Sequence, residues 1–145
     1  MRLCFLLLLV SGASGAEDAG VATAKLSVAV QGFRNQKGQL LAAVYDSEAN
    51  WLKVEKAVRV VRLPIPGRDA TVSFEGLTPG IYAVSVFHDE NANGKFDMHW
   101  FPVPGPDEGA AQSNDAKAHL GPPAFDDAKF RLGAGETAIQ VHLVY

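Results

Sequence analysis

Residues 81–97 read Ile-Tyr-Ala-Val-Ser-Val-Phe-His-Asp-Glu-Asn-Ala-Asn-Gly-Lys-Phe-Asp, and the other elements are best understood from this stretch. Its first seven residues are almost continuously apolar and include two aromatic side chains. Such a run favours a strand that is buried on both faces. The residues that follow are mostly polar or acidic. The sequence therefore predicts a central strand over 81–87 that delivers His88 and Asp89 to the edge of a sheet.

Six further segments read as strands because apolar residues recur in them at every second position or on both faces. They are residues 25–31, 39–45, 57–63, 71–74, 128–132 and 137–145. Seven short strands without a long helix predict an all-β protein: a single antiparallel two-sheet sandwich over residues 24–145. Between 88 and 128 we expect one long loop, with a short helix at 115–120 or around 126–128.

The first residues are typical of a signal peptide over 1–16. Arg2 gives the positive start, 3–10 form an apolar run too short to span a bilayer, and 11–16 are all small. Residues 17–23 are expected to be a flexible tail. The sole cysteine, Cys4, would leave with the signal peptide. We therefore expect an exported protein, periplasmic or extracellular, without thiol catalysis, disulfides or cysteine-bound zinc.

Charge and length exclude other classes. The 145 residues carry 13 Lys and Arg against 16 Asp and Glu, a net charge of -3 without a basic run. This disfavours nucleic-acid binding. No second apolar segment is long enough to predict a membrane span. The length fits one domain with one core.

The polar part of the central stretch has the spacing of a calcium loop, with oxygen donors at positions 1, 3, 5, 7 and 9 and a glycine at position 6. The predicted donors are the side chains of Asp89, Asn91, Asn93 and Asp97 and the backbone carbonyl of Lys95. We expect His88, Glu90 and Gly94 to orient the loop. Position 12, where such loops carry a bidentate Glu, is Trp100. Calcium is therefore the predicted ion, bound weakly.

A plain structural turn explains the same residues. Asp, Asn and Gly are common in turns because they tolerate left-handed backbone and bond to their own main chain. An Asn-Gly step after a strand is also an ordinary hairpin signal. The sequence leaves both interpretations open.

The segment after the loop is rich in aromatic residues and prolines, and it could present a surface for a carbohydrate or for another envelope protein. The candidate residues are Trp100, Phe101, Ser113 and Asn114. Alternatively, the aromatic side chains fold back over the open end of the sandwich.

Four stretches together resemble the bacterial domain of unknown function 2141 family. They are Phe74-x-Gly76-Leu77-x-Pro79-Gly80-x-Tyr82, residues 88–97, Ser113-Asn114 and Pro122-Pro123-x-Phe125-x-Asp127-Ala128-x-Phe130, before a last strand that ends in an aromatic residue. The resemblance covers essentially all of the chain after the signal peptide. It implies an exported envelope protein with an immunoglobulin-like or transthyretin-like sandwich, and no particular activity. The family usually has a stretch with a characteristic aromatic residue and glycine after the acidic loop, and residues 101–114 do not match that stretch.

Two functions follow. The first is a non-catalytic binding or structural module of the envelope. The alternative is a metal-dependent hydrolase acting on an envelope substrate through His88, Asp89 and His99. A nucleophilic triad of Ser113, His88 and Asp127 lacks any local signature.

Overall fold

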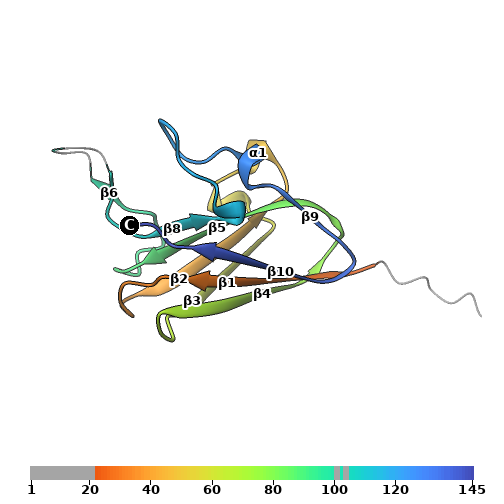
Figure 1. The fold of residues 1–145 in the computed structure, drawn as a ribbon, viewed down its shortest axis with the longest axis horizontal. Helices are drawn as coiled ribbons and strands as arrows, with labels where there is room; N and C mark the ends of the chain where they lie inside the picture. The colour runs from red at the N-terminus through yellow and green to blue at the C-terminus, as the bar shows by residue number, and fades with distance from the viewer. Residues whose placement is uncertain (1–21, 100–101, 103–104) are drawn as a thin grey trace, which may run out of the picture.

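The computed structural model describes residues 22–99, 102 and 105–145. The predicted signal peptide, 1–16, lies outside the described residues, as does most of the predicted tail, 17–23. Within the described residues the protein is all-β, and the helices there are all short (Figure 1). The strands are β1 Ala24–Gln31, β2 Gln39–Tyr45, β3 Arg59–Pro64, β4 Asp69–Leu77, β5 Gly80–Asp89, β6 Met98–His99, β7 Gly105–Pro106, β8 Ala110–Gln112, β9 Phe130–Leu132 and β10 Gly135–His142. The helices are the 3-10 helices η1 Glu48–Asn50, η2 Val54–Lys56 and η3 Ser113–Asp115, and α1 Phe125–Ala128.

Three sheets are present in the described part of the chain. A three-stranded sheet has the order β10-β1-β4, and a five-stranded sheet has the order β3-β2-β5-β8 with β9 also paired to β5. The third sheet is the small arm β6-β7, which extends away from the other strands (Figure 1). Each of the seven predicted strands has a counterpart in β1 to β5, β9 or β10.

The main core contains side chains from both larger sheets. In β1 every second residue is buried, so Leu26, Val28 and Val30 face inward as predicted. They join Leu40 and Val84 from the five-stranded sheet in one cluster. Burial of such side chains is the main favourable term in folding, at roughly 25 cal/mol per Å² of apolar area removed from water.

The five-stranded sheet buries its other face as well, which explains the continuous apolar character of β2 and β5. A second cluster contains Tyr45, Ala83 and Phe87 from this face, together with Phe125 of α1. Trp51 packs edge-on between Tyr45 and Phe125, at ring-centroid distances of 5.2 and 5.8 Å. The segments around η1, η2 and α1 therefore form a cover over the outer face of β2 and β5.

Two expectations about the strands were wrong. The pairing of β10 with β1 is parallel, from Ala24 beside Gly135 to Gln31 beside His142, so the sheets are not wholly antiparallel. The region expected as one long loop contains β6, β7, β8 and η3. The short helix lies at Phe125–Ala128, which includes the second of the two expected positions, 126–128. Within the described segments, no helix is both long enough and apolar enough to cross a bilayer.

Candidate functional site

The end of β5 sends two neighbouring polar side chains to opposite faces of the sheet, because residues of a strand alternate. His88 pairs with Leu40 of the inner core, and Asp89 pairs with Gln39. Both His88 and Asp89 are 0% exposed. The amide Nε2 of Gln39 donates a hydrogen bond of 2.7 Å to Oδ2 of Asp89. The strand thus places the imidazole in the end of the core and the carboxylate at the start of the loop.

Asp89 fixes the turn of the loop through backbone donors. Its Oδ1 accepts from the N–H of Asn93 at 3.0 Å, and its Oδ2 accepts from the N–H of Gly94 at 2.7 Å. Gly94 has a φ of 76° and Ala92 a φ of 56°, so the chain passes through left-handed backbone twice. Gly94 adopts this conformation at no steric cost, which is why a glycine suits this position.

The other predicted donor side chains converge on Asp97. Nδ2 of Asn91 and Nδ2 of Asn93 donate to Oδ2 of Asp97 at 2.7 and 2.9 Å. Their Oδ1 atoms accept from the backbone N–H of Asn93 and Lys95, at 3.1 and 2.9 Å. Asp89, Asn91, Asn93 and Asp97 therefore form one hydrogen-bonded unit instead of pointing separately into solvent.

Glu108 joins the two ends of this loop from outside it, a role that no sequence pattern indicated. Its side chain is only 3% exposed. One carboxylate oxygen accepts from the N–H of Glu90 at 3.0 Å, and the other accepts from the N–H of Asp97 at 3.1 Å. Burial raises the pKa of the Glu108 carboxyl, and the nearby carboxylates of Asp97 and Asp89 act in the same direction against the two N–H donors. The two ends of the loop are thus joined through a single carboxylate.

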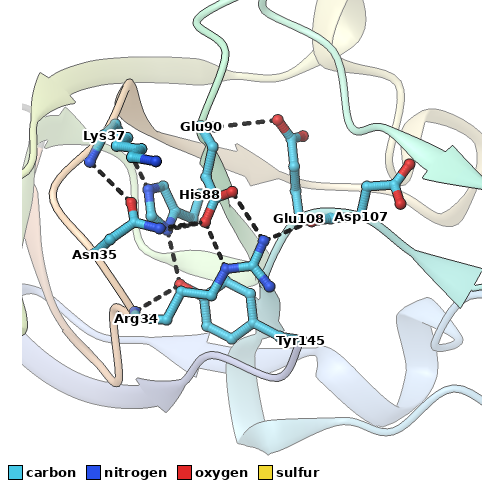
Figure 2. Close-up of polar contacts among 8 residues, drawn as sticks. All are labelled: Arg34, Asn35, Lys37, His88, Glu90, Asp107, Glu108 and Tyr145. Carbon is cyan, nitrogen blue, oxygen red and sulfur yellow. Dashed lines mark hydrogen bonds and ion pairs between the residues drawn. The ribbon is translucent and has the colours of Figure 1, made fainter.

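Behind the loop, His88 is held on both ring nitrogens (Figure 2). Its Nε2 lies 2.7 Å from the carbonyl oxygen of Lys37, which can only accept, so Nε2 carries the hydrogen. In the neutral ring Nδ1 then accepts from the hydroxyl of Tyr145, 2.7 Å away. That hydroxyl in turn accepts from the backbone N–H of Arg34 at 3.1 Å. One tautomer of His88 satisfies every contact.

Arg34 and Glu90 form the charged part of the same network (Figure 2). The guanidinium donates to both carboxylate oxygens of Glu90, at 2.6 and 2.8 Å, and Asn35 adds a third donor at 2.9 Å. The Arg34 hydrogen bond lowers the pKa of Glu90 to about 2. The guanidinium also lies 4.4 Å from the centre of the Tyr145 ring, a cation–π contact. Glu90 therefore connects the loop, through Arg34, to Tyr145, which follows β10.

A polar hollow of about 480 Å³ lies beside the loop. It is lined by Lys37, Glu90, Asn91, Asp97, Met98, Asp107 and Glu108. Four of these seven residues are acidic and one is basic. The hollow therefore favours a small polar or cationic ligand over an apolar one.

The comparisons with known proteins agree with the resemblance noted in the sequence. A model of a bacterial family described as "Uncharacterized protein conserved in bacteria (DUF2141)" matches residues 28–140. The chain belongs to the DUF2141 family. No curated protein and no solved structure matches it. For this DUF2141 protein, the contacts within the chain are the direct evidence about the site.

For this DUF2141 protein, the prediction that Ser113 belongs to a ligand surface is wrong. Ser113 is 0% exposed; its Oγ accepts from the N–H of Val84 at 2.9 Å and donates to the carbonyl of Ala128. It therefore ties η3 to β5 and α1 and is closed to a ligand. Asn114 is exposed, but its amide donates to the carbonyls of Asp127 and Lys129. Trp100 and Phe101 lie outside the described residues.

In this DUF2141 protein, the two histidines of the alternative hydrolase site, His88 and His99, form hydrogen bonds with different groups in different parts of the fold. His88 has both ring nitrogens bonded inside the core, as described above. His99 lies on the β6–β7 arm, with Nδ1 2.8 Å from a carboxylate oxygen of Asp107. Among residues 22–99, 102 and 105–145, no group of three or more His, Cys, Asp and Glu side chains is placed to hold a metal ion. The predicted calcium loop differs from such a cluster, because its donors would be side-chain amide oxygens and a backbone carbonyl as well as two carboxylates.

Proposed function

We propose that this protein is an exported, non-catalytic binding or structural module of the bacterial envelope, and that residues 89–97 form a weak calcium-binding loop. The convergence of Asn91, Asn93 and Asp97, in a turn fixed by buried Asp89, carries this proposal. Such convergence is what a hard cation with oxygen ligands requires. With only two carboxylates among the donors, we expect affinity at the millimolar end of the range for calcium loops.

Ion binding would exchange one set of contacts for another. Oδ1 of Asn91 and of Asn93 each accept one backbone N–H, and a carbonyl oxygen has two lone pairs, so each retains one for a cation. The carboxylate of Asp97 would give up its two amide donors and bind the ion directly. The turn itself, which depends on Asp89 and Gly94, need not change.

The proposed architecture is an immunoglobulin-like or transthyretin-like sandwich. The cluster shared by the two larger sheets and the seven predicted strands support it. In this arrangement the sandwich serves as a scaffold that presents the loop and the adjacent hollow to a partner. An envelope protein or a carbohydrate is the proposed partner, because the hollow is polar and the residues near 1–16 are typical of an export signal.

Calorimetry and thermal melting with calcium and with a chelator test the ion. A ligand at about ten times its Kd stabilises the folded state by about 1.4 kcal/mol, so calcium should raise the Tm of the wild-type protein. Asp97→Ala should lose this response. Asp126→Ala is the matched control, because Asp126 is an exposed carboxylate on α1 paired with Lys129. An unchanged Tm at about 10 mM calcium, with no heat of binding, would reject the ion site.

A further inference from the structure

Asn93 and Gly94 form the sole Asn-Gly step in the chain. A glycine after asparagine has no Cβ to hinder its backbone nitrogen from approaching the asparagine side chain. We propose that Asn93 is a site of spontaneous deamidation, and that the folded loop restrains this reaction through Asp89 and Asp97. The inference is independent of whether the loop binds calcium.

The reaction needs only water. The backbone nitrogen of Gly94 loses its proton and attacks Cγ of Asn93, forming a carbon–nitrogen bond. The bond between Cγ and Nδ2 breaks, and ammonia leaves with the proton that the backbone nitrogen gave up. Water then opens the resulting five-membered succinimide at one of its two carbonyls. The product is aspartate or isoaspartate at position 93, and one water is consumed for each ammonia released.

The site is open to this chemistry. Asn93 is an exposed residue, so water reaches the succinimide and ammonia can leave. No atom lies within 4 Å of the position that a Cβ of Gly94 would occupy. The space on that side of the Gly94 Cα is therefore free of atoms from residues other than its two chain neighbours.

The folded loop restrains both reacting groups. The attacking nitrogen of Gly94 donates its hydrogen to Oδ2 of Asp89 at 2.7 Å. The Asn93 amide is held at both ends, since Oδ1 accepts from the N–H of Lys95 at 2.9 Å and Nδ2 donates to Oδ2 of Asp97 at 2.9 Å. Attack requires these contacts to open together. Asp89 is itself buried and bonded to Gln39, so the restraint on the nucleophile is anchored in the sheet.

The product would change the loop that made it. A carboxylate at position 93 cannot donate to Asp97, and it adds a second negative charge beside that side chain. Isoaspartate also lengthens the main chain of the turn by one carbon, which separates the Gly94 N–H from Asp89. The extent of modification therefore depends on the fraction of time that the loop has spent in its open state.

The experiment follows each asparagine by peptide mapping and mass spectrometry after incubation of the full chain at mildly alkaline pH with a chelator. The synthetic peptide of residues 87–99 serves as the unrestrained reference. We expect conversion at Asn93 to be at least about tenfold slower in the wild type than in the peptide, because reaction requires the open loop. Asp97→Ala should convert several times faster than the wild type, Asp97→Asn should fall between them, and Asp126→Ala should match the wild type. The internal controls Asn35, Asn50, Asn91 and Asn114, which no glycine follows, should stay unconverted.

Three results would overturn the inference. Equal rates in the wild type and the peptide would show that the loop gives no protection. A folded Asp97→Ala protein that converts no faster than the wild type would show that the restraint does not depend on Asp97. If another asparagine converted faster than Asn93, in the peptide or in the Asp97→Ala protein, Asn93 would not be the preferred site of the reaction. Urea unfolding of both Asp97 variants checks that they are folded, and Asp97→Asn supplies the comparison if Asp97→Ala is not.

Discussion

The hydroxyl of Tyr145 lies 2.7 Å from Nδ1 of His88, and this contact joins the segment after β10 to the residue that precedes the loop. The two rings meet edge-on with their centroids 6.0 Å apart. Phe33 packs against His88 from another side, at 5.3 Å. His88 and Tyr145 therefore form a polar pair at the end of the main core, and the loop begins at the next residue, Asp89.

Removing the Tyr145 hydroxyl should destabilise the protein more than an ordinary Tyr→Phe change. In Tyr145→Phe, Nδ1 of the buried His88 and the N–H of Arg34 both lose their partner. Leaving a buried polar atom unpaired costs about 1–3 kcal/mol. Urea unfolding would measure the loss.

Tyr82→Phe is the matched control for that measurement. The Tyr82 hydroxyl donates to the carbonyl of Thr78, a residue four positions away, in a part-buried setting. The same hydroxyl also lies 3.2 Å from Oγ1 of Thr78. Its loss should cost about 0.5–1.5 kcal/mol, because both partner atoms belong to the exposed Thr78 and can bond to water instead. Equal losses in the two variants would mean that the His88 contact contributes no more than the local contact between Tyr82 and Thr78.

The Arg34–Glu90 pair should make stability depend on acid pH. The pKa of Glu90 is lowered to about 2 by Arg34, below its ordinary value of 4.5. A group with a lowered folded-state pKa stabilises the protein above its unfolded pKa, and this contribution disappears as the pH falls toward the folded value. The free energy of unfolding of wild type minus that of Glu90→Gln should therefore be largest at neutral pH and shrink between about pH 4.5 and pH 2.

Urea titrations at several pH values would follow that difference. Glu75→Gln is the control, because the Glu75 side chain is 76% exposed and its distance to Lys25 is 3.7 Å. An exposed pair of this kind contributes about 0–1 kcal/mol. A difference for Glu90→Gln that stays constant as the pH falls would contradict the ion-pair explanation.

Glu108→Gln should loosen one end of the loop. A carboxamide has the shape of the carboxylate, but one of its two positions is an NH₂ that cannot accept from an N–H. Either the Glu90 or the Asp97 amide then loses its acceptor. Because burial raises the pKa of Glu108, removing the charge also relieves a desolvation cost, so the change in overall stability should be smaller than for an ordinary lost contact.

Amide hydrogen exchange is the sharper measurement for Glu108. One of the two loop amides should exchange about tenfold faster, since 1.4 kcal/mol of lost protection corresponds to that factor. Asp107→Asn is the control, because the side chain of this neighbouring carboxylate is 51% exposed. Unchanged exchange at both amides would show that Glu108 does not close the loop.

The features that could be predicted from the sequence are those that depend on which face a residue occupies. The alternation in β1 and the double-sided burial of β2 and β5 follow directly from apolar spacing. The calcium-like spacing of 89–97 likewise predicted a compact turn with inward side chains, although a turn and an ion site share that pattern.

What the sequence could not reveal are partners that are distant along the chain. Alternation does not encode the direction of a neighbouring strand, so the parallel pairing of β10 with β1 was missed. The strands β6 and β7 contain two residues each, too few to show a period. Glu108 and Ser113 look like ordinary loop residues, and their roles depend on backbone groups up to 29 positions away. Among the residues outside 88–97 that hold the loop or His88, only Tyr145 had a signal, as the aromatic end of the family pattern.

Gly38 offers the most direct test of how the loop meets β2. Its φ is 67°, and a Cβ at this position would overlap the carbonyl oxygen of Asp89 and lie 2.6 Å from the carbonyl carbon of Glu90. Gly38→Ala must therefore displace either the start of the loop or the turn that carries Lys37, in addition to straining the backbone. We expect the free energy of unfolding, measured in urea, to fall by at least about 2 kcal/mol.

Gly133→Ala is the control, because no atom lies within 4 Å of its Cβ position and its φ is not left-handed. That variant should keep or gain up to about 1 kcal/mol, since alanine reduces the entropy of the unfolded chain. Similar stability in the two variants would show that the close approach of Gly38 to Asp89 does not exist in solution.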